Sequence, residues 1–169
     1  MAKSSNVRPA GEIAIIVSRY NASVTGPMLD GAKREYARRR GSEAGLHVFE
    51  APGAYELPVI AQAAAESERF DGVVALGCVI KGETSHDKYI SQAVADGLML
   101  VGIYTGVPAA FGVLTVDTPA QAMDRAGGAH GNKGEEAMAA LLDTLATIGA
   151  INGGPKPALT LRPDKAGQR

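Results

Sequence analysis

The chain has 169 residues, 46% of them hydrophobic and 5% aromatic, and it contains no tryptophan. This length supports one sizeable hydrophobic core, so we expect a single domain over residues 1–151, with residues 1–10 as an N-terminal arm and residues 152–169 as a flexible tail. The 17 Lys and Arg residues nearly balance the 18 Asp and Glu residues. A formal net charge of -1 provides no cationic field, which argues against a nucleic-acid-binding protein.

The single cysteine and the apolar segments limit the cellular setting. Cys78 has no partner for an internal disulfide or a cysteine metal cluster, which favours a reducing compartment. No apolar run approaches the ~20 residues that span a bilayer, and residues 1–10 lack the apolar core of a signal peptide. We therefore expect a cytoplasmic protein with no membrane partner.

The N-terminal half alternates between expected strands and helices. Residues 12–18 form a short, nearly continuous apolar run that is typical of a buried parallel strand. A helix is expected next, because residues 21–25 offer capping side chains, apolar residues recur at helical spacing, and Gly41 ends the pattern. Residues 46–50 predict a second strand and residues 55–68 a second helix.

The alternation continues through the C-terminal half. Residues 72–80 are the most apolar run and predict a central strand, and the polar loop 81–86 separates it from a long helix at 87–105. The remaining expected elements are a strand at 111–115 and helices at 118–126 and 135–149. This order predicts an α/β fold with helices on both faces of a doubly wound parallel sheet. Ligands of such sheets bind beyond the carboxyl ends of the strands, so we expect functional residues just after strands.

The loop 81–86 is the first candidate for a site. Its backbone N–H groups open an expected helix, where the helix dipole favours an anion such as phosphate. The alternative is an ordinary helix cap formed by Thr84 or Ser85. His86 ends the loop and could exchange protons near neutral pH, although a histidine here could also merely cap or pack.

One cation precedes the glycine-rich stretch 127–134 and another lies within it. Arg125 ends a short expected helix, where a cation is favourable and carries little information, whereas Lys133 stands near the start of the next helix, where a cation is unusual. The stretch lacks the glycine order of a nucleotide-binding loop. The three histidines of the chain lack the spacing of metal ligands, so we expect no metal site.

The turns after the first two expected strands also carry polar and aromatic groups. Tyr20 and Asn21 follow the first strand, where an aromatic ring could stack on a planar heterocycle. Ala54 and Glu56 follow the second, where Glu56 could accept hydrogen bonds from a polyol. Both residues also have an interpretation without a ligand: Tyr20 could be an ordinary exposed turn tyrosine, and Glu56 an acid favoured in the first turn of a helix. The convergence of these turns with the loop 81–86 on one sheet edge predicts a ligand site.

Several strings, in order and spacing, resemble the motifs of the lumazine synthase family over about residues 12–149: SRYN (18–21), APGAYELP (51–58), GCVIKGETSH (77–86), FGVLT (111–115) and RAGGAHGNKG (125–134). The resemblance implies a flavodoxin-like three-layer α/β/α sandwich with a central parallel sheet, in which the N-terminal segment adds to the sheet of a neighbouring subunit. It also implies condensation of 5-amino-6-(D-ribitylamino)uracil with 3,4-dihydroxy-2-butanone 4-phosphate to 6,7-dimethyl-8-ribityllumazine, phosphate and water in riboflavin biosynthesis, without any cofactor.

The resemblance implies a role for individual residues. His86 matches the catalytic histidine of the family. The phosphate would be bound by Arg125, Glu83, Thr84 and Lys133. The pyrimidine and ribityl groups would be bound by Tyr20, Asn21, Ala54, Tyr55, Glu56, Cys78, Val79, Ile80 and Phe111. Among these, Phe111 resembles the aromatic residue that is contributed across a subunit boundary, and Tyr20 stands where phenylalanine or tryptophan is common.

The resemblance also implies assembly. Family members build pentamers with active sites between neighbouring subunits, and some pack further into shells of sixty chains. The short connection 127–131 resembles shell-forming members. The alternative to an enzyme is a non-catalytic carrier or shell protein that binds flavin or lumazine, and turnover would separate the two.

Overall fold

The computed structural model describes residues 11–158. The elements in chain order are β1 (Ile13–Ser18), α1 (Ala22–Arg40), β2 (Leu46–Ala51), α2 (Leu57–Glu66), β3 (Gly72–Ile80), α3 (His86–Thr105), β4 (Ala109–Val116), α4 (Pro119–Arg125), β5 (Ala126–Gly128), β6 (Gly131–Asn132) and α5 (Lys133–Ile151). The first four strands form one parallel sheet in the order β2-β1-β3-β4. The predicted α/β fold with a parallel sheet is confirmed, whereas the expected arm at 1–10 lies outside the described residues.

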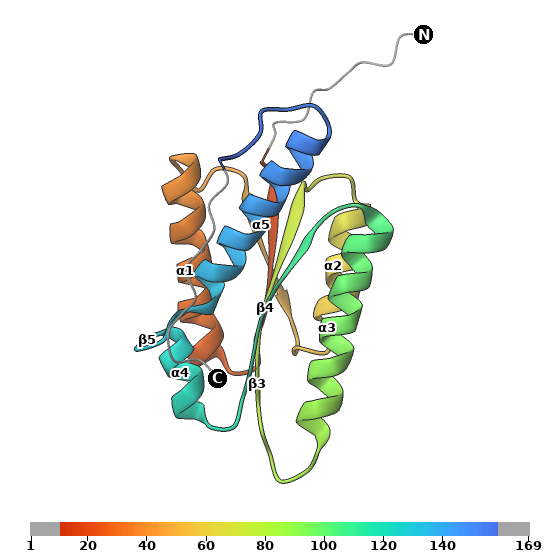
Figure 1. Ribbon diagram of the computed structural model, residues 1–169. Coiled ribbons are helices and arrows are strands. Elements are labelled where there is room, and N and C mark those ends of the chain that lie inside the picture. The colour runs from red at the N-terminus through yellow and green to blue at the C-terminus, as the bar shows by residue number, and fades with distance from the viewer. Residues whose placement is uncertain (1–10, 159–169) are drawn as a thin grey trace.

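The sheet is the middle of three layers. Helices α1, α4 and α5 cover one face and α2 and α3 cover the other (Figure 1). Side chains alternate between the two cores along β1, with Ile13 and Ile15 on one side and Ala14 and Ile16 on the other. β1 and nearly all of β3 are buried because they occupy the interior of the sheet, while the edge strands β2 and β4 carry exposed residues.

Most element ends lie within two residues of the predicted ends. Helix α1 stops at Gly41, whose φ of 84° and N–H bond to the Ala37 carbonyl form the expected glycine cap. Residues 21–25 were expected to supply a capping side chain, but the residue in the cap position, Asn21, has a φ of 59° and its side chain makes no cap bond. Helix α2 is shorter than predicted, beginning at Leu57 after Glu56 in the cap position.

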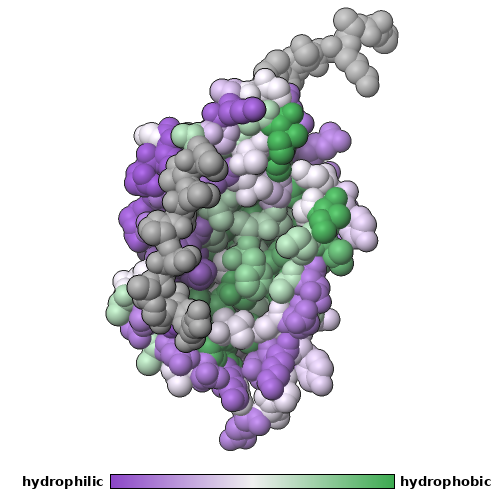
Figure 2. All heavy atoms as spheres, viewed as in Figure 1, coloured by the Kyte–Doolittle hydropathy of each residue, from purple (hydrophilic) through white to green (hydrophobic). Residues whose placement is uncertain are grey.

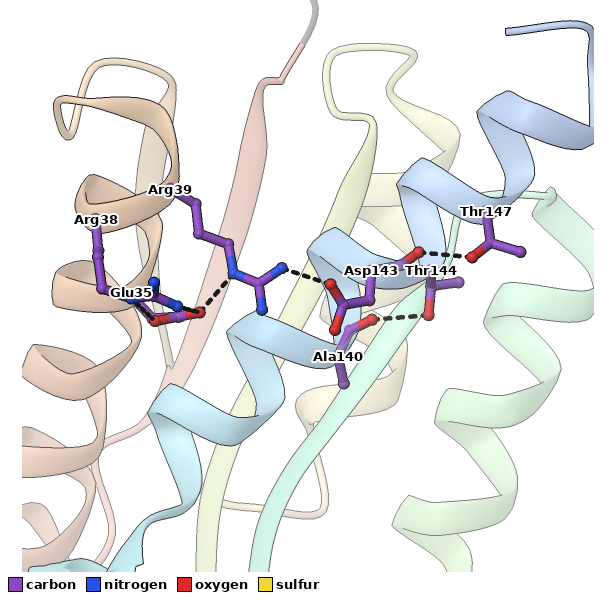
Figure 3. A network of polar contacts seen from close by, with 7 residues as sticks. All are labelled: Glu35, Arg38, Arg39, Ala140, Asp143, Thr144 and Thr147. Atoms are coloured by element: carbon purple, nitrogen blue, oxygen red, sulfur yellow. Dashed lines mark hydrogen bonds and ion pairs between the residues drawn. The ribbon is translucent and has the colours of Figure 1, made fainter. Parts of the chain in front are cut away.

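A polar network joins α1 to α5 on the outside of the sheet (Figure 3). The Glu35 carboxylate is 3% exposed and accepts two hydrogen bonds of 2.7 Å from Arg38 and one of 2.6 Å from Arg39. Arg39 also binds Asp143 on α5. Because Arg38 first and then Arg39 stabilise the charged carboxylate, the pKa of Glu35 lies below its ordinary value.

The free edge of β4 lies at the bottom of an apolar hollow between α5 and α3 (Figure 2). On the α5 side, the hollow contains a cavity of about 400 Å³ whose lining includes Ala109, Phe111, Lys133 and Ala137. β4 pairs only with β3 among the described strands, so its outer backbone groups face this hollow. No helix within residues 11–158 is both long and apolar enough to cross a membrane.

Candidate functional site

The turn after β1 is fixed by hydrogen bonds that leave its aromatic ring free. The Ser18 Oγ accepts a 3.2 Å bond from the Tyr20 N–H, and Thr25 Oγ1 donates a 2.9 Å bond to the Ser18 carbonyl. The Asn21 side chain donates a 2.9 Å bond from Nδ2 to the Cys78 carbonyl at the end of β3. Tyr20 is 72% exposed at this edge, so its ring is available for stacking on a planar group.

The turn after β2 lies against the same end of β3. Ala54 is buried in the core cluster that also contains Val79, and a methyl group on Gly77 would lie 3.5 Å from the Ala54 Cβ. Tyr55 is exposed, and Glu56 is half-buried at the cap position of α2. The structure therefore brings this turn next to the last residues of β3, as the convergence of loops predicted.

At the end of β3, a ligand would meet main-chain atoms, because the side chains there are buried or partly buried. Cys78 and Val79 are buried and Ile80 is partly buried. Burial raises the pKa of the Cys78 thiol to about 11, which leaves the thiol protonated and unreactive near neutral pH. The groups that residues 78–80 offer to a ligand are therefore main-chain N–H and carbonyl groups. One of them, the Cys78 carbonyl, already accepts a hydrogen bond from Asn21.

The loop 81–86 is exposed throughout and leads into α3. His86 is the first residue of this 20-residue helix, and its N–H donates a 3.4 Å bond to Thr84 Oγ1. Of the two alternative caps, Ser85 occupies the cap position without a side-chain cap bond, whereas the Thr84 hydroxyl accepts the bond from the first N–H of the helix. Among residues 11–158, none forms a hydrogen bond or ion pair with the His86 ring, and the exposed ring is open to a ligand.

Arg125 and Lys133 are brought together by the hairpin β5–β6, which was not predicted. Ala126 pairs with Asn132 in this hairpin. Arg125, which precedes Ala126, and Lys133, which follows Asn132, therefore occupy neighbouring backbone positions. Among the described residues, the Arg125 guanidinium makes one 3.5 Å bond, to the Gln121 carbonyl, and the Lys133 ammonium lies 2.6 Å from a Glu136 oxygen. The two cations are therefore neighbours along the backbone near the start of α5, and this pair is called the cationic group below.

The two cations and the loop 81–86 stand on opposite faces of the sheet. Arg125 ends α4, which packs with α1 and α5, whereas His86 begins α3, which packs with α2 (Figure 1). Lys133 instead lines the same cavity as Phe111, which is 43% exposed on β4. Within one chain, the candidate residues thus form a carboxyl-edge group and a separate cationic group.

The comparisons with known proteins decide the family. Residues 10–148 match the family model for 6,7-dimethyl-8-ribityllumazine synthase. The chain is 48% identical over 139 residues to 6,7-dimethyl-8-ribityllumazine synthase 1 of Caulobacter vibrioides, covering 82% of this chain and 91% of that one. It is 44% identical over 140 residues to the synthase of Thermus thermophilus, covering 83% and 89%, and 43% identical over 134 residues to that of Deinococcus deserti, covering 79% and 86%.

The chain belongs to the 6,7-dimethyl-8-ribityllumazine synthase family. A lumazine synthase is a transferase of riboflavin biosynthesis, so the chain is an enzyme that acts on small molecules and assembles into oligomers. The three-layer α/β/α sandwich is the flavodoxin-like fold that the resemblance implied. These comparisons confirm the predicted family, fold and reaction.

One residue of this lumazine synthase was missed by the sequence analysis. Asn132 is 7% exposed, although asparagine is mostly an exposed residue, and its side chain accepts bonds from the N–H groups of Gly134 and Glu135. A signal was present, since asparagine followed three positions later by glutamate resembles a capping box at a helix start. The predicted start of this helix at residue 135 was therefore two residues late.

Proposed function

We propose that the carboxyl-edge group of one subunit and the cationic group of a neighbouring subunit together form each active site of this lumazine synthase. The arrangement in a single chain supports this proposal, because the loop 81–86 and Arg125 lie on different faces of the sheet. The free β4 edge, with Phe111 and Lys133 at its cavity, supplies an apolar surface on which a neighbour could pack.

The carboxyl-edge group would bind 5-amino-6-(D-ribitylamino)uracil. The exposed ring of Tyr20 would stack on the pyrimidine, and the Asn21 bond to the Cys78 carbonyl would hold that turn against the backbone of residues 78–80. Ala54, Tyr55 and Glu56 would contact the ribityl chain, whose hydroxyls are donors for the Glu56 carboxylate. Phe111 of the neighbour would cover the ring from the other side.

The phosphate of the second substrate would bind between the two groups. The loop 81–86 offers backbone N–H groups at Glu83 and Thr84 and the positive end of the α3 dipole. Arg125 of the neighbour would add a planar, permanently charged guanidinium that matches two phosphate oxygens at once. Lys133 would contribute a second positive charge beside it, shared with Glu136.

The chemistry needs proton movement and close placement of the substrates. The 5-amine of the uracil attacks the ketone carbonyl and the adduct loses water to form an imine. Elimination of phosphate then leaves an enol that tautomerises to a ketone. The ribitylamino nitrogen attacks this new carbonyl, and loss of a second water completes the ring. His86, open at the mouth of this edge, would accept and return protons in these steps. Much of the acceleration would come from holding two substrates together, an effect worth up to roughly 7–11 kcal/mol in ideal cases, so His86 would modulate the rate.

The assembly would be a pentamer or a sixty-subunit shell acting in the cytoplasm. The short β5–β6 connection, with Gly131 at a φ of 82°, supports the shell by its resemblance to shell-forming members. The arm at residues 1–10, which lies outside the described residues, would belong to the single domain that ends near residue 151 and would add a strand to a neighbour. Sedimentation of the full chain and of a chain lacking residues 1–10 would separate these assemblies, and a stable monomer would contradict the shared site.

Mixed oligomers test the shared site directly. Arg125→Ala disables the cationic group and Glu56→Ala disables the carboxyl-edge group, so oligomers of either variant alone should form lumazine slowly. Oligomers formed by co-expressing both variants should regain activity, because some sites then receive two intact groups. No recovery in verified mixed oligomers would place both groups in one subunit. Arg34→Ala, an exposed change on α1, is the control and should match the parent.

A further inference from the structure

Asn132 occupies the point where three segments of the chain meet. Its Nδ2 donates to the carbonyls of Pro27 on α1, at 2.8 Å, and of Ala126 on β5, at 3.1 Å. Its Oδ1 accepts from the N–H groups of Gly134 and Glu135, at 2.9 and 3.1 Å, and so caps α5. The side chain thereby uses both of its donor hydrogens and both lone pairs of its oxygen.

The surroundings of Asn132 leave no room for another arrangement. A methyl group on Gly31 of α1 would lie 2.3 Å from the Asn132 Oδ1, and one on Gly134 would lie 1.9 Å from the Met28 carbonyl. Real side chains do not approach this closely, so glycine is required at both positions for α1 and the start of α5 to come this close. The amide is therefore held rigidly between the helices.

We propose that Asn132 is a positioning residue for the phosphate site of this lumazine synthase. Its amide bonds the carbonyl of the residue that follows Arg125 and caps the helix that begins with Lys133. It also ties both to α1, the helix that follows Tyr20 and Asn21. One neutral side chain thus fixes the backbones that carry both cations relative to the body of the subunit. This inference rests on the phosphate role proposed above for Arg125.

Asn132→Asp separates positioning from helix capping. Aspartate keeps an oxygen for the N–H groups of Gly134 and Glu135, and it is an equally good cap. It loses the two donor bonds and directs an acceptor at the carbonyls of Pro27 and Ala126, which forces the hairpin to move. We expect the KM for 3,4-dihydroxy-2-butanone 4-phosphate to rise by about 10- to 100-fold, as for a displacement near 1 Å in an active site. The KM for the uracil substrate should stay close to the parent value.

Tyr36→Phe is the matched control. The Tyr36 hydroxyl lies near two main-chain carbonyls, of Gly11 and Ala44, at 2.8 and 3.0 Å, but at the amino end of the sheet. Its removal should lower stability and leave both KM values unchanged. A selective rise in one KM for Asn132→Asp is therefore an effect that general destabilisation does not produce.

A double-mutant cycle with Arg125→Ala distinguishes failure of this inference from failure of the proposed function. If Asn132 acts through Arg125, adding Asn132→Asp to Arg125→Ala should raise the KM for the phosphate substrate little further. Independent, additive effects, or an unchanged KM in the single Asp variant, would overturn the positioning role while leaving the Arg125 role intact. An unchanged KM in Arg125→Ala itself would instead overturn the proposed phosphate site.

Gly31→Ala decides the question if Asn132→Asp does not fold. The added methyl group displaces the Asn132 amide without changing any residue near the substrates. The same selective rise in the KM for the phosphate substrate is expected. Failure of both variants to fold would assign Asn132 to folding alone and overturn the inference.

Discussion

Replacing Glu35 with glutamine should destabilise the protein in a pH-dependent way. The buried carboxylate of Glu35 receives charge-assisted hydrogen bonds from Arg38 and Arg39, and Arg39 continues the network to Asp143 on α5 (Figure 3). Glutamine has nearly the same shape but carries no charge. The change therefore weakens these bonds and the link between the two helices without opening a cavity.

The magnitude follows from the exposure of each arginine. Arg38 is 67% exposed, so its ion pair is screened by water and contributes little. Arg39 is 27% exposed, and a hydrogen bond to a charged group in that setting contributes about 1.5–3 kcal/mol. We expect a loss of about 2–3 kcal/mol in the free energy of unfolding at neutral pH, which lowers Tm by roughly 4–12 °C for a chain of this size.

Thermal unfolding of parent and variant from about pH 7 to about pH 3, at one protein concentration, tests this expectation. The pKa of Glu35 is lowered in the folded state from its ordinary 4.5, so its contribution is present above the ordinary value and is lost as the pH falls through the folded pKa. The gap between parent and variant should close in acid, where Glu35 is protonated. Glu66→Gln, an exposed change on α2, is the control. A gap that persists unchanged in acid would refute the reasoning.

Three further outcomes are expected. Gly134→Ala should lower Tm sharply or prevent folding, because its methyl group would lie 1.9 Å from the Met28 carbonyl. The control, Gly149→Ala on the same helix, meets nothing within 4 Å and should stabilise the protein by about 0.5–1 kcal/mol. Equal Tm values for the two variants would contradict this prediction. Cys78, with its pKa raised to about 11, should resist a thiol reagent at about pH 8 until the protein is denatured. His86→Ala should reduce kcat by about 10- to 100-fold and Arg125→Ala should cost more, so abolition of lumazine formation by His86→Ala alone would assign the histidine an obligatory role.

The order of strands and helices could be predicted from the sequence because it depends on local patterns. A continuous β-branched run such as residues 13–17 is compatible with a strand buried on both faces, and a glycine such as Gly41 ends a helix wherever it adopts a positive φ. Likewise, the turns after the first three strands could be placed at one sheet edge, because parallel strands all end there. The bond from Asn21 to the Cys78 carbonyl shows that the first of these turns contacts the carboxyl end of β3, from which the third turn leaves.

Relations between distant segments depended on the tertiary structure. The family resemblance implied that Arg125 and the loop 81–86 bind one phosphate, and only the tertiary structure shows that, within one chain, α4 and α3 lie on opposite faces of the sheet. The role of Asn132 also depends on a carbonyl 105 positions away in the chain, and the network at Glu35 depends on Asp143 of another helix. Residue types and periodicity indicate which side chains of a segment are buried. They do not indicate which distant segment of the chain packs against those side chains. These contacts between distant segments depend on how the helices pack, and Gly31 and Gly134 allow α1 and α5 to approach closely enough to make them.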